Sequence, residues 1–177
     1  VILFGKESEI LNKPEINKYI SSVTLPNGTS VDVGDRSGFS ENDKFANPVM
    51  VLPGSTIEYT IVIGGEGEDS FTVQDYFDQD ALSYYSSSSS LGSDLEGTYD
   101  VGDSFTVTLT VDDDVGSSGA KYPNTAAIPD YNLESSDYIE IEYELEEEVI
   151  THNTSGNYKK YIIKHNGNAV TGRDGYN

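Results

Sequence analysis

Three polar residues stand on the apolar phase of strand-like runs and could react with one another. Residues i and i+2 of a strand point to the same side. This rule places Lys18 with Ile16 and Ile20, Asp75 with Val73 and Phe77, and Asn124 with Ala126 and Ile128. If these faces point inward, a lysine, an aspartate and an asparagine enter one core. A lone buried charge is costly, so such groups are expected to be paired or chemically consumed.

Our hypothesis is that Lys18 and Asn124 become a covalent side-chain amide, with Asp75 assisting. A lysine amine attacks a carboxamide carbon only as the neutral base, and burial lowers the pKa of a lysine. A carboxylic acid kept protonated by the same burial can hydrogen-bond the amide oxygen and help ammonia to leave. The reaction happens once per molecule, so the chain is not expected to be an enzyme with turnover.

A noncovalent alternative stays open for the same residues. It is an ion pair between Lys18 and Asp75, with Asn124 capping a turn. Asp78 and Asp80 are alternative acids, although Asp80 lies beyond the strand and Asp78 is out of phase with the apolar face.

The runs that carry these residues belong to a chain rich in strand signals. Alternation is clearest at 57–63, 105–111 and 139–145, and turn signals such as Asn27-Gly28 and Pro53-Gly54 separate the runs. About seven or eight strands, with no amphipathic helix and a long loop at 34–48, predict an all-β antiparallel sandwich. Because the chain begins with Val1 and not Met, we expect a processed protein or a fragment.

Three regions are expected along the chain. Residues 1–13 are an N-terminal extension or donor strand, 14–147 are the sandwich, and 148–177 are a C-terminal hairpin, linker or tail. An apolar terminus, Val1, Ile2, Leu3 and Phe4, could add to the sheet of a neighbouring copy by strand donation.

Composition excludes several classes of function. The net charge of -21 argues against nucleic acid and anionic lipid as partners. The chain has no cysteine, so a disulfide framework and thiolate metal sites are excluded and another cross-link is worth seeking. No apolar run is long enough to span a membrane. The two histidines, His152 and His165, have no cysteine or serine-elbow motif to act with, which argues against hydrolysis.

Acidic runs offer a second kind of chemistry. Carboxylate oxygens at Asp112, Asp113 and Asp114 could bind calcium, as could the glutamates between 140 and 148. No stretch has the ligand spacing of a calcium loop, so solvated acidity is the competing interpretation. Calcium is therefore the one cofactor considered, and otherwise none is expected.

An ordered set of motifs resembles a known family. It comprises Pro-Gly with Tyr-Thr-Ile at 53–61, Phe-Thr-Val-x-Asp at 71–75, Gly-Asp-Ser-Phe-Thr-Val-Thr-Leu-Thr-Val at 102–111 and Asn-Thr-Ala at 124–126. The set resembles the conserved-repeat Ig-like modules of prokaryotic surface proteins over residues 14–147. The turn after Ile63 departs from the family pattern, and residues 149–177 lie outside it. The resemblance implies an extracellular Ig-like sandwich, and related pilin and adhesin domains carry a Lys–Asn isopeptide bond beside an acidic residue.

We therefore expect a structural module of an extracellular adhesin, stalk or pilus-like filament, at a cell surface or in a secreted filament. Its expected partners are other copies, neighbouring modules of the same surface protein, or a host or cell-surface ligand. The alternatives are a filament subunit joined by strand donation, and a surface module that binds calcium or carbohydrate, for which the 13 tyrosines could supply a surface.

Overall fold

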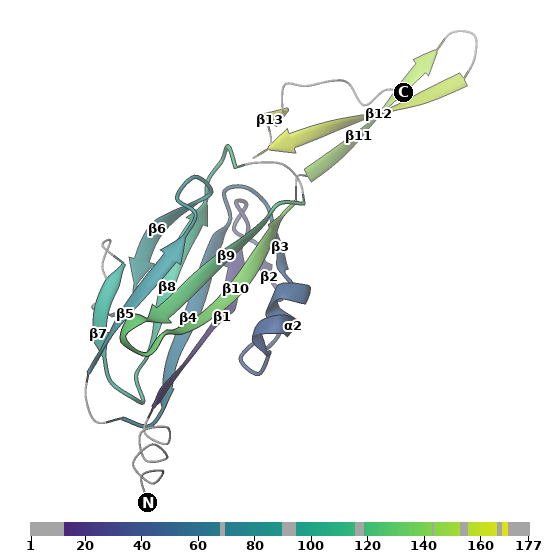
Figure 1. Cartoon of the computed structure of the whole chain (residues 1–177). Coiled ribbons are helices and arrows are strands. Elements are labelled where there is room, and N and C mark those ends of the chain that lie inside the picture. The colour runs from purple at the N-terminus through teal and green to yellow at the C-terminus, as the bar shows by residue number, and fades with distance from the viewer. Residues whose placement is uncertain are drawn as a thin grey trace, which may run out of the picture.

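Between residues 14 and 141 the chain forms two β-sheets stacked face to face (Figure 1). The computed structural model describes residues 13–67, 70–89, 95–115 and 119–142 with their side chains, and the backbone of strands at 144–152, 156–165 and 168–169. Both of the stacked sheets have five strands and are mainly antiparallel. The prediction of an all-β, sandwich-like fold is therefore confirmed.

The first sheet has the strand order β2-β1-β4-β8-β6. Its central strands are long and alternate buried with half-buried residues, as expected for a sheet with one face on a core. The strands are β1 (Pro14–Thr24), β2 (Ser30–Val31), β4 (Thr56–Gly65), β6 (Leu82–Ser87) and β8 (Ser104–Val111). β2 pairs with β1 only at its end, opposite Val23 and Thr24, so most of one edge of β1 lacks a strand neighbour in this sheet.

The second sheet has the order β3-β10-β9-β5-β7. Its one parallel pairing joins β3 to β10, and the other neighbours are antiparallel. The strands are β3 (Val49–Val51), β5 (Phe71–Phe77), β7 (Glu96–Tyr99), β9 (Lys121–Ile128) and β10 (Leu133–Ile141), and a 3-10 turn at Pro129–Tyr131 connects β9 to β10.

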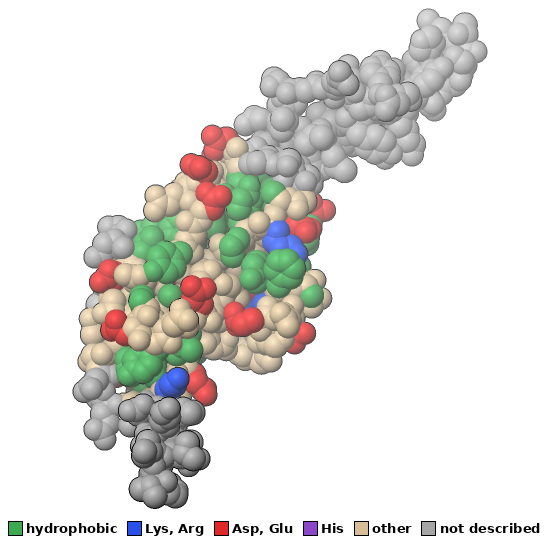
Figure 2. Space-filling view, in the orientation of Figure 1, with side chains coloured by type: hydrophobic (Ala, Val, Ile, Leu, Met, Phe, Trp, Pro, Cys, Tyr) green, Lys and Arg blue, Asp and Glu red, His purple; other side chains and the backbone are tan. Residues whose placement is uncertain are grey.

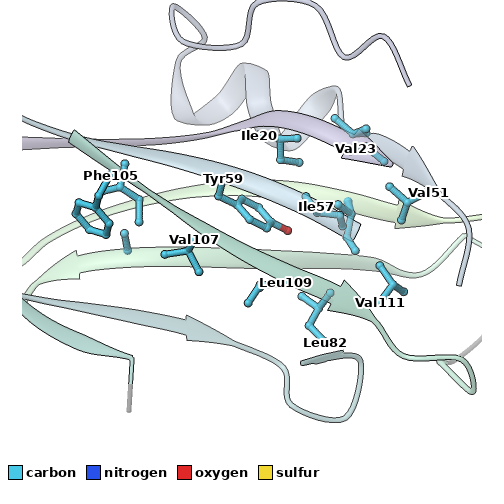
Figure 3. Packing of buried hydrophobic residues seen from close by; sticks show 14 of the residues in the cluster. Ile20, Val23, Val51, Ile57, Tyr59, Leu82, Phe105, Val107, Leu109 and Val111 are labelled. Atoms are coloured by element: carbon cyan, nitrogen blue, oxygen red, sulfur yellow. The ribbon is translucent and has the colours of Figure 1, made fainter. Parts of the chain in front are cut away.

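Apolar residues from both sheets fill the space between them. Ile57, Tyr59, Leu109, Ile128 and Ile139 are fully buried there. Figure 3 shows the ring of Tyr59 in the interior of the sandwich, among aliphatic side chains that include Ile57, Val107 and Leu109. On the outside, Figure 2 shows acidic side chains spread over the visible face and few basic ones, in keeping with the net charge of -21.

The prediction of a loop throughout 34–48 is wrong in one respect. A short helix, α2 (Glu41–Ala46), forms within it and lies beside β10 (Figure 1). Its start is fixed by a capping box: the side chain of Ser40 accepts from the Asp43 N–H, and the carboxylate of Asp43 accepts from the Ser40 N–H. Local hydrogen bonding thus creates a helix where hydrophobic periodicity predicts none.

Strand count and strand boundaries also differ from the prediction. The stacked sheets contain ten strands, because β2, β3 and β7 are too short to show a clear alternation. The expected strand across 138–145 ends at Ile141, and a new strand, β11 (Glu144–His152), pairs with β12 (Gly156–His165). β13 (Asn168–Ala169) completes this three-stranded sheet. The boundary expected at 147/148 therefore falls inside β11.

Two further expectations concern the ends of the chain and its relation to membranes. The proposed donor segment, Val1 to Phe4, lies outside the described residues, so strand donation stays a prediction. No helix in the described part of the chain is long and apolar enough to cross a membrane.

The stacked sheets predict where truncation is costly. Leu109 on β8 is fully buried, whereas its neighbour Thr108 points to the outer face. Leu109→Ala should lower the free energy of unfolding by about 2–5 kcal/mol through lost burial and a cavity. Thr108→Ala, the control, should cost less than about 1 kcal/mol. Urea unfolding followed by tyrosine fluorescence measures both, and equal losses would contradict this placement of the core.

Candidate cross-linking site

Asp75 and Asn124 meet on the inner face of the second sheet. Asp75 on β5 lies opposite Ala126 of β9, and Phe77 lies opposite Asn124, so the two polar residues are diagonal neighbours on adjacent strands. Both side chains are buried, with 2% of Asp75 and none of Asn124 exposed. Diagonal neighbours on one sheet face are within reach of each other's side chains. The strand register therefore brings an acid and an amide together in the core.

Lys18 reaches the same point from the opposite sheet. Its side chain is fully buried, and its Nζ donates a hydrogen bond to Oδ1 of Asp75 in a buried ion pair. The ring of Tyr59, on the neighbouring strand β4, lies 4.8 Å from Nζ measured to the ring centroid. The lysine amine thus has one carboxylate and one aromatic face as its immediate surroundings.

Asn124 completes a triad around the carboxylate. Its Nδ2 donates to Oδ2 of Asp75 over 2.8 Å and to the carbonyl of Tyr76 over 2.9 Å. Its buried Oδ1 accepts no hydrogen bond from any described residue. Since the Tyr76 carbonyl can only accept, the side-chain amide of Asn124 must point its nitrogen, and not its oxygen, towards this carbonyl. The two oxygens of Asp75 are therefore shared between the amine of Lys18 and the amide of Asn124.

Burial shifts the acid–base chemistry of this triad towards a reactive amine. The pKa of Lys18 is lowered from 10.5 to about 8, mainly by burial, and the nearby charge of Lys44 makes a smaller contribution in the same direction. Asp75, and to a smaller degree Asp137, act in the opposite direction because they favour the ammonium. A neutral lysine amine, which is the nucleophilic form, is therefore populated at mildly alkaline pH.

The arrangement can support amide formation with balanced atoms. A proton moves from Nζ of Lys18 to Asp75, Nζ attacks Cγ of Asn124, and the Cγ–Nδ2 bond breaks as ammonia leaves. Of the three protons on the lysine ammonium, one stays on the new amide, one leaves with the ammonia and one neutralises Asp75. Asp75 is placed for both transfers because one of its oxygens contacts the nucleophile and the other the leaving nitrogen.

The structure also bears on the alternatives drawn from the sequence. Asn124 lies within β9 and does not cap a turn, so that part of the noncovalent alternative is wrong. The ion pair between Lys18 and Asp75 itself is present. The alternative acids, Asp78 and Asp80, are exposed beyond the end of β5, where the Asp80 N–H bonds the Asp78 carboxylate over 2.9 Å. Asp75 is the acid at this site.

Sequence reasoning missed a second set of buried polar residues beside the triad. They are Arg36, Lys44, Ser135 and Asp137. Ser135 and Asp137 alternate with Ile139 and Ile141 on β10, so the rule that singled out Asp75 could also have found them. Arg36 and Lys44 come from the region taken as a loop, where the only available signal was the capping box at Ser40.

The calcium hypothesis finds no assembled site in the part of the chain whose side chains are described. No group of three metal-ligating side chains occurs there. Asp113 and Asp114 are exposed, and the carboxylate of Asp112 accepts a hydrogen bond from the hydroxyl of Ser83 over 2.7 Å. The side chains of Glu146, Glu147 and Glu148 lie outside the described residues.

Comparison with family models and with curated proteins adds no relative. No family model matches the chain, and no curated protein matches it. What the protein does is therefore inferred from its own residues.

The lowered pKa of Lys18 predicts how stability depends on pH when no bond has formed. In Asn124→Ala, Lys18 remains a free amine. Between pH 8 and 10 the unfolded chain then binds more protons than the folded one, so stability rises with pH, by at most about 2–3 kcal/mol. Above pH 10 the raised pKa of buried Tyr59 acts in the opposite direction, because the folded state holds that proton longer.

The double variant Lys18→Met/Asn124→Ala is the control for this prediction. It lacks the buried amine, so its stability should not show the same increase. Urea titrations of both variants at pH 7, 8, 9 and 10 measure the difference. Parallel curves for the two variants would mean that burial does not lower the pKa of Lys18.

Proposed function

We propose that the chain is an Ig-like structural module of an extracellular adhesin, stalk or pilus-like filament, stabilised by an isopeptide bond between Lys18 and Asn124. The observation that carries the proposal is one buried carboxylate, Asp75, that hydrogen-bonds a lysine from one sheet and an asparagine from the other. A nucleophile, an acid–base group and an electrophile thus meet where their side chains expose almost no surface.

The location of the bond suits a module that bears load. Lys18 is on β1, the first strand, and Asn124 is on β9 of the opposite sheet, so the bond would tie the two sheets together. The chain between residues 18 and 124 would become a closed loop of 106 residue steps. By the loop-entropy model for cross-links, a loop of this length stabilises the folded state by about 4–5 kcal/mol. Because the chain has no cysteine, this bond would supply the covalent stabilisation that disulfides give other proteins.

The Ig-like class and the extracellular setting are part of the proposal. The motif order along 53–126 and the stacking of two mainly antiparallel sheets support the class. The charge of -21 and the lack of cysteine support a solvated, surface-exposed module whose neighbours are further copies or modules. Residues 14–141 would be the sandwich, with the segments on either side of it connecting to neighbours.

Bond formation predicts a defined mass for the purified protein. Condensation of Lys18 with Asn124 releases one ammonia, so the intact mass should be about 17 Da below the sum of the residues. Digestion should also yield one branched peptide that joins segments around residues 18 and 124. Intact-mass and tandem mass spectrometry measure both quantities.

Variants of the triad give the matched controls for the mass. Lys18→Met and Asn124→Ala should have their full expected masses because each lacks a reacting group. Asp75→Asn should retain both groups but link slowly or not at all. Lys13→Met, at the edge of the described region, should keep the deficit. A wild-type chain with its full mass, folded and incubated at pH 8, would rule out the isopeptide bond.

A second candidate function, carbohydrate binding, is favoured by one observation. A pocket of about 240 Å³ opens beside the end of β5 and includes Tyr76, Gln74, Gln79 and Glu96 in its lining. Tyr76 is 49% exposed, and its hydroxyl bonds the Gln74 amide, whose nitrogen donates to Glu96 over 3.2 Å. An exposed aromatic ring beside amide and carboxylate groups is suited to the apolar face and hydroxyls of a sugar.

Carbohydrate binding predicts a localised mutational effect. Tyr76→Ala should reduce binding to any glycan captured on an array by about tenfold or more, since it removes the stacking surface. Tyr85→Ala is the control, because Tyr85 is even more exposed but belongs to β6 of the other sheet. Absence of any glycan bound above background, or equal losses in the two variants, would exclude this pocket as a sugar site.

A further inference from the structure

A second fully buried lysine, Lys44, lies beside the proposed nucleophile. It projects from α2, and none of its surface is exposed. Its Nζ donates to the main-chain carbonyl of Lys18 over 2.7 Å and to Oγ of Ser135 over 3.0 Å, and it forms an ion pair of 2.5 Å with Glu41. A longer contact of 3.4 Å joins Nζ to Oδ1 of Asn17, so four acceptors surround the three N–H groups of the ammonium. The mechanism outlined above does not use Lys44.

Lys44 contacts a part of β1 that has no strand neighbour on that side. The carbonyl of Lys18 accepts from Lys44, and the N–H of Lys18 donates to Oγ of Ser135 over 2.8 Å. Two residues on, the N–H of Ile20 donates to the carboxylate of Asp137 over 2.8 Å. Along this edge of β1, beyond its short pairing with β2, side chains from α2 and β10 therefore make the hydrogen bonds that a neighbouring strand would make. Both main-chain polar groups of Lys18 are held by them.

The hydroxyl of Ser135 joins the helix to the strand. It accepts from the N–H of Lys18 and from Nζ of Lys44, and it donates to the carboxylate of Glu41 over 3.0 Å. Glu41 in turn accepts from the N–H of Ser136 over 2.7 Å. The hydroxyl of Ser135 thus uses its donor and both acceptor positions, which fixes its orientation between the helix and the strand.

We propose that Lys44 is a positioning residue for the isopeptide reaction: carried by α2, it holds the main chain of Lys18 so that the amine stays directed at Asp75 and Asn124. This inference rests on the proposed cross-link and adds a role for the helix that interrupts the 34–48 segment. A displacement of the Lys18 main chain by a fraction of a bond length would change how Nζ approaches the amide carbon of Asn124. Reaction rates are very sensitive to the distance and angle of such an approach.

Lys44 also acts on the charge of the nucleophile. The charged and titratable groups that face Lys18 are Asp75 from β5, Asp137 from β10, Tyr59 from β4 and Lys44 from α2. The positive charge of Lys44 disfavours a second ammonium nearby, whereas the two aspartates favour it. A residue that merely packs the helix against the sheet would not alter the protonation of Lys18. The pH dependence of the cross-linking rate therefore distinguishes the proposed role of Lys44 from simple packing.

The test follows cross-linking in time. The chain is expressed as inclusion bodies, so that it has not yet folded, and is dissolved in denaturant. It is then refolded by dilution at pH values from 6 to 10, and the loss of about 17 Da is followed over time by intact mass. Lys44→Met keeps most of the side-chain volume and removes the charge and the donors. It should slow bond formation about tenfold or more at pH 7 and move the midpoint of the pH–rate profile to higher pH.

Lys121→Met is the matched control. Lys121 also contacts α2, because its Nζ donates to the carbonyl of Phe45 over 3.0 Å and lies 4.2 Å from the centroid of the Phe45 ring. No described contact joins it to Lys18, so the rate and the midpoint should equal those of the wild type. Equal rates and midpoints in Lys44→Met and the wild type would overturn the role of Lys44.

A second variant keeps the test decisive if Lys44→Met does not fold. Glu41 is half-exposed, so Glu41→Gln should fold. It leaves the charge of Lys44 without its closest counter-ion, and the midpoint of the pH–rate profile should then move to lower pH. An unchanged midpoint would overturn the proposal. A folded wild-type chain that never loses mass would instead overturn the isopeptide bond itself, and with it any role for Lys44 in forming that bond.

Discussion

The interior of this protein depends on one buried carboxylate. Asp75 accepts from a lysine of one sheet and an asparagine of the other, and it does so where almost no surface is exposed. A buried ion pair recovers its desolvation cost only when every oxygen and every proton has a partner. Formation of an amide would change this balance, because the lysine charge disappears and the acid becomes neutral. The reaction would thus convert a costly polar contact into a neutral covalent one.

The polar layer around Asp75 extends to the open edge of β1. Ser135 and Asp137 of β10 bind main-chain N–H groups of that edge, and Asp137 is itself held by Arg36 through bonds of 2.8 and 2.6 Å. An edge strand with unpaired main-chain groups tends to pair with other chains. Here side chains from β10, α2 and the segment before α2 occupy part of the edge. The same contacts that protect it also fix the residue that would react.

Much of the fold follows from alternation in the sequence. The long strands β4, β8 and β10 alternate strongly, because one face of each contacts the core. The short elements escape this rule. β3 and β7 are three and four residues long, and α2 is a single capped segment of six residues, so each carries too few residues to show a period. β3 and β7 form because they pair with β10 and β5, whereas α2 begins at its capping box and lies beside β10.

The sequence alone determined that Lys18, Asp75 and Asn124 would face the apolar side of their strands, because side-chain direction in a strand depends only on position along it. It also determined the acidity and the absence of disulfides. Only the tertiary structure decided that these three residues meet, that Asn124 donates to both Asp75 and Tyr76, and that Lys44 binds the main chain of Lys18. Those facts depend on strand order, register and sheet stacking. They arise from contacts between segments up to about a hundred residues apart, which no local pattern records.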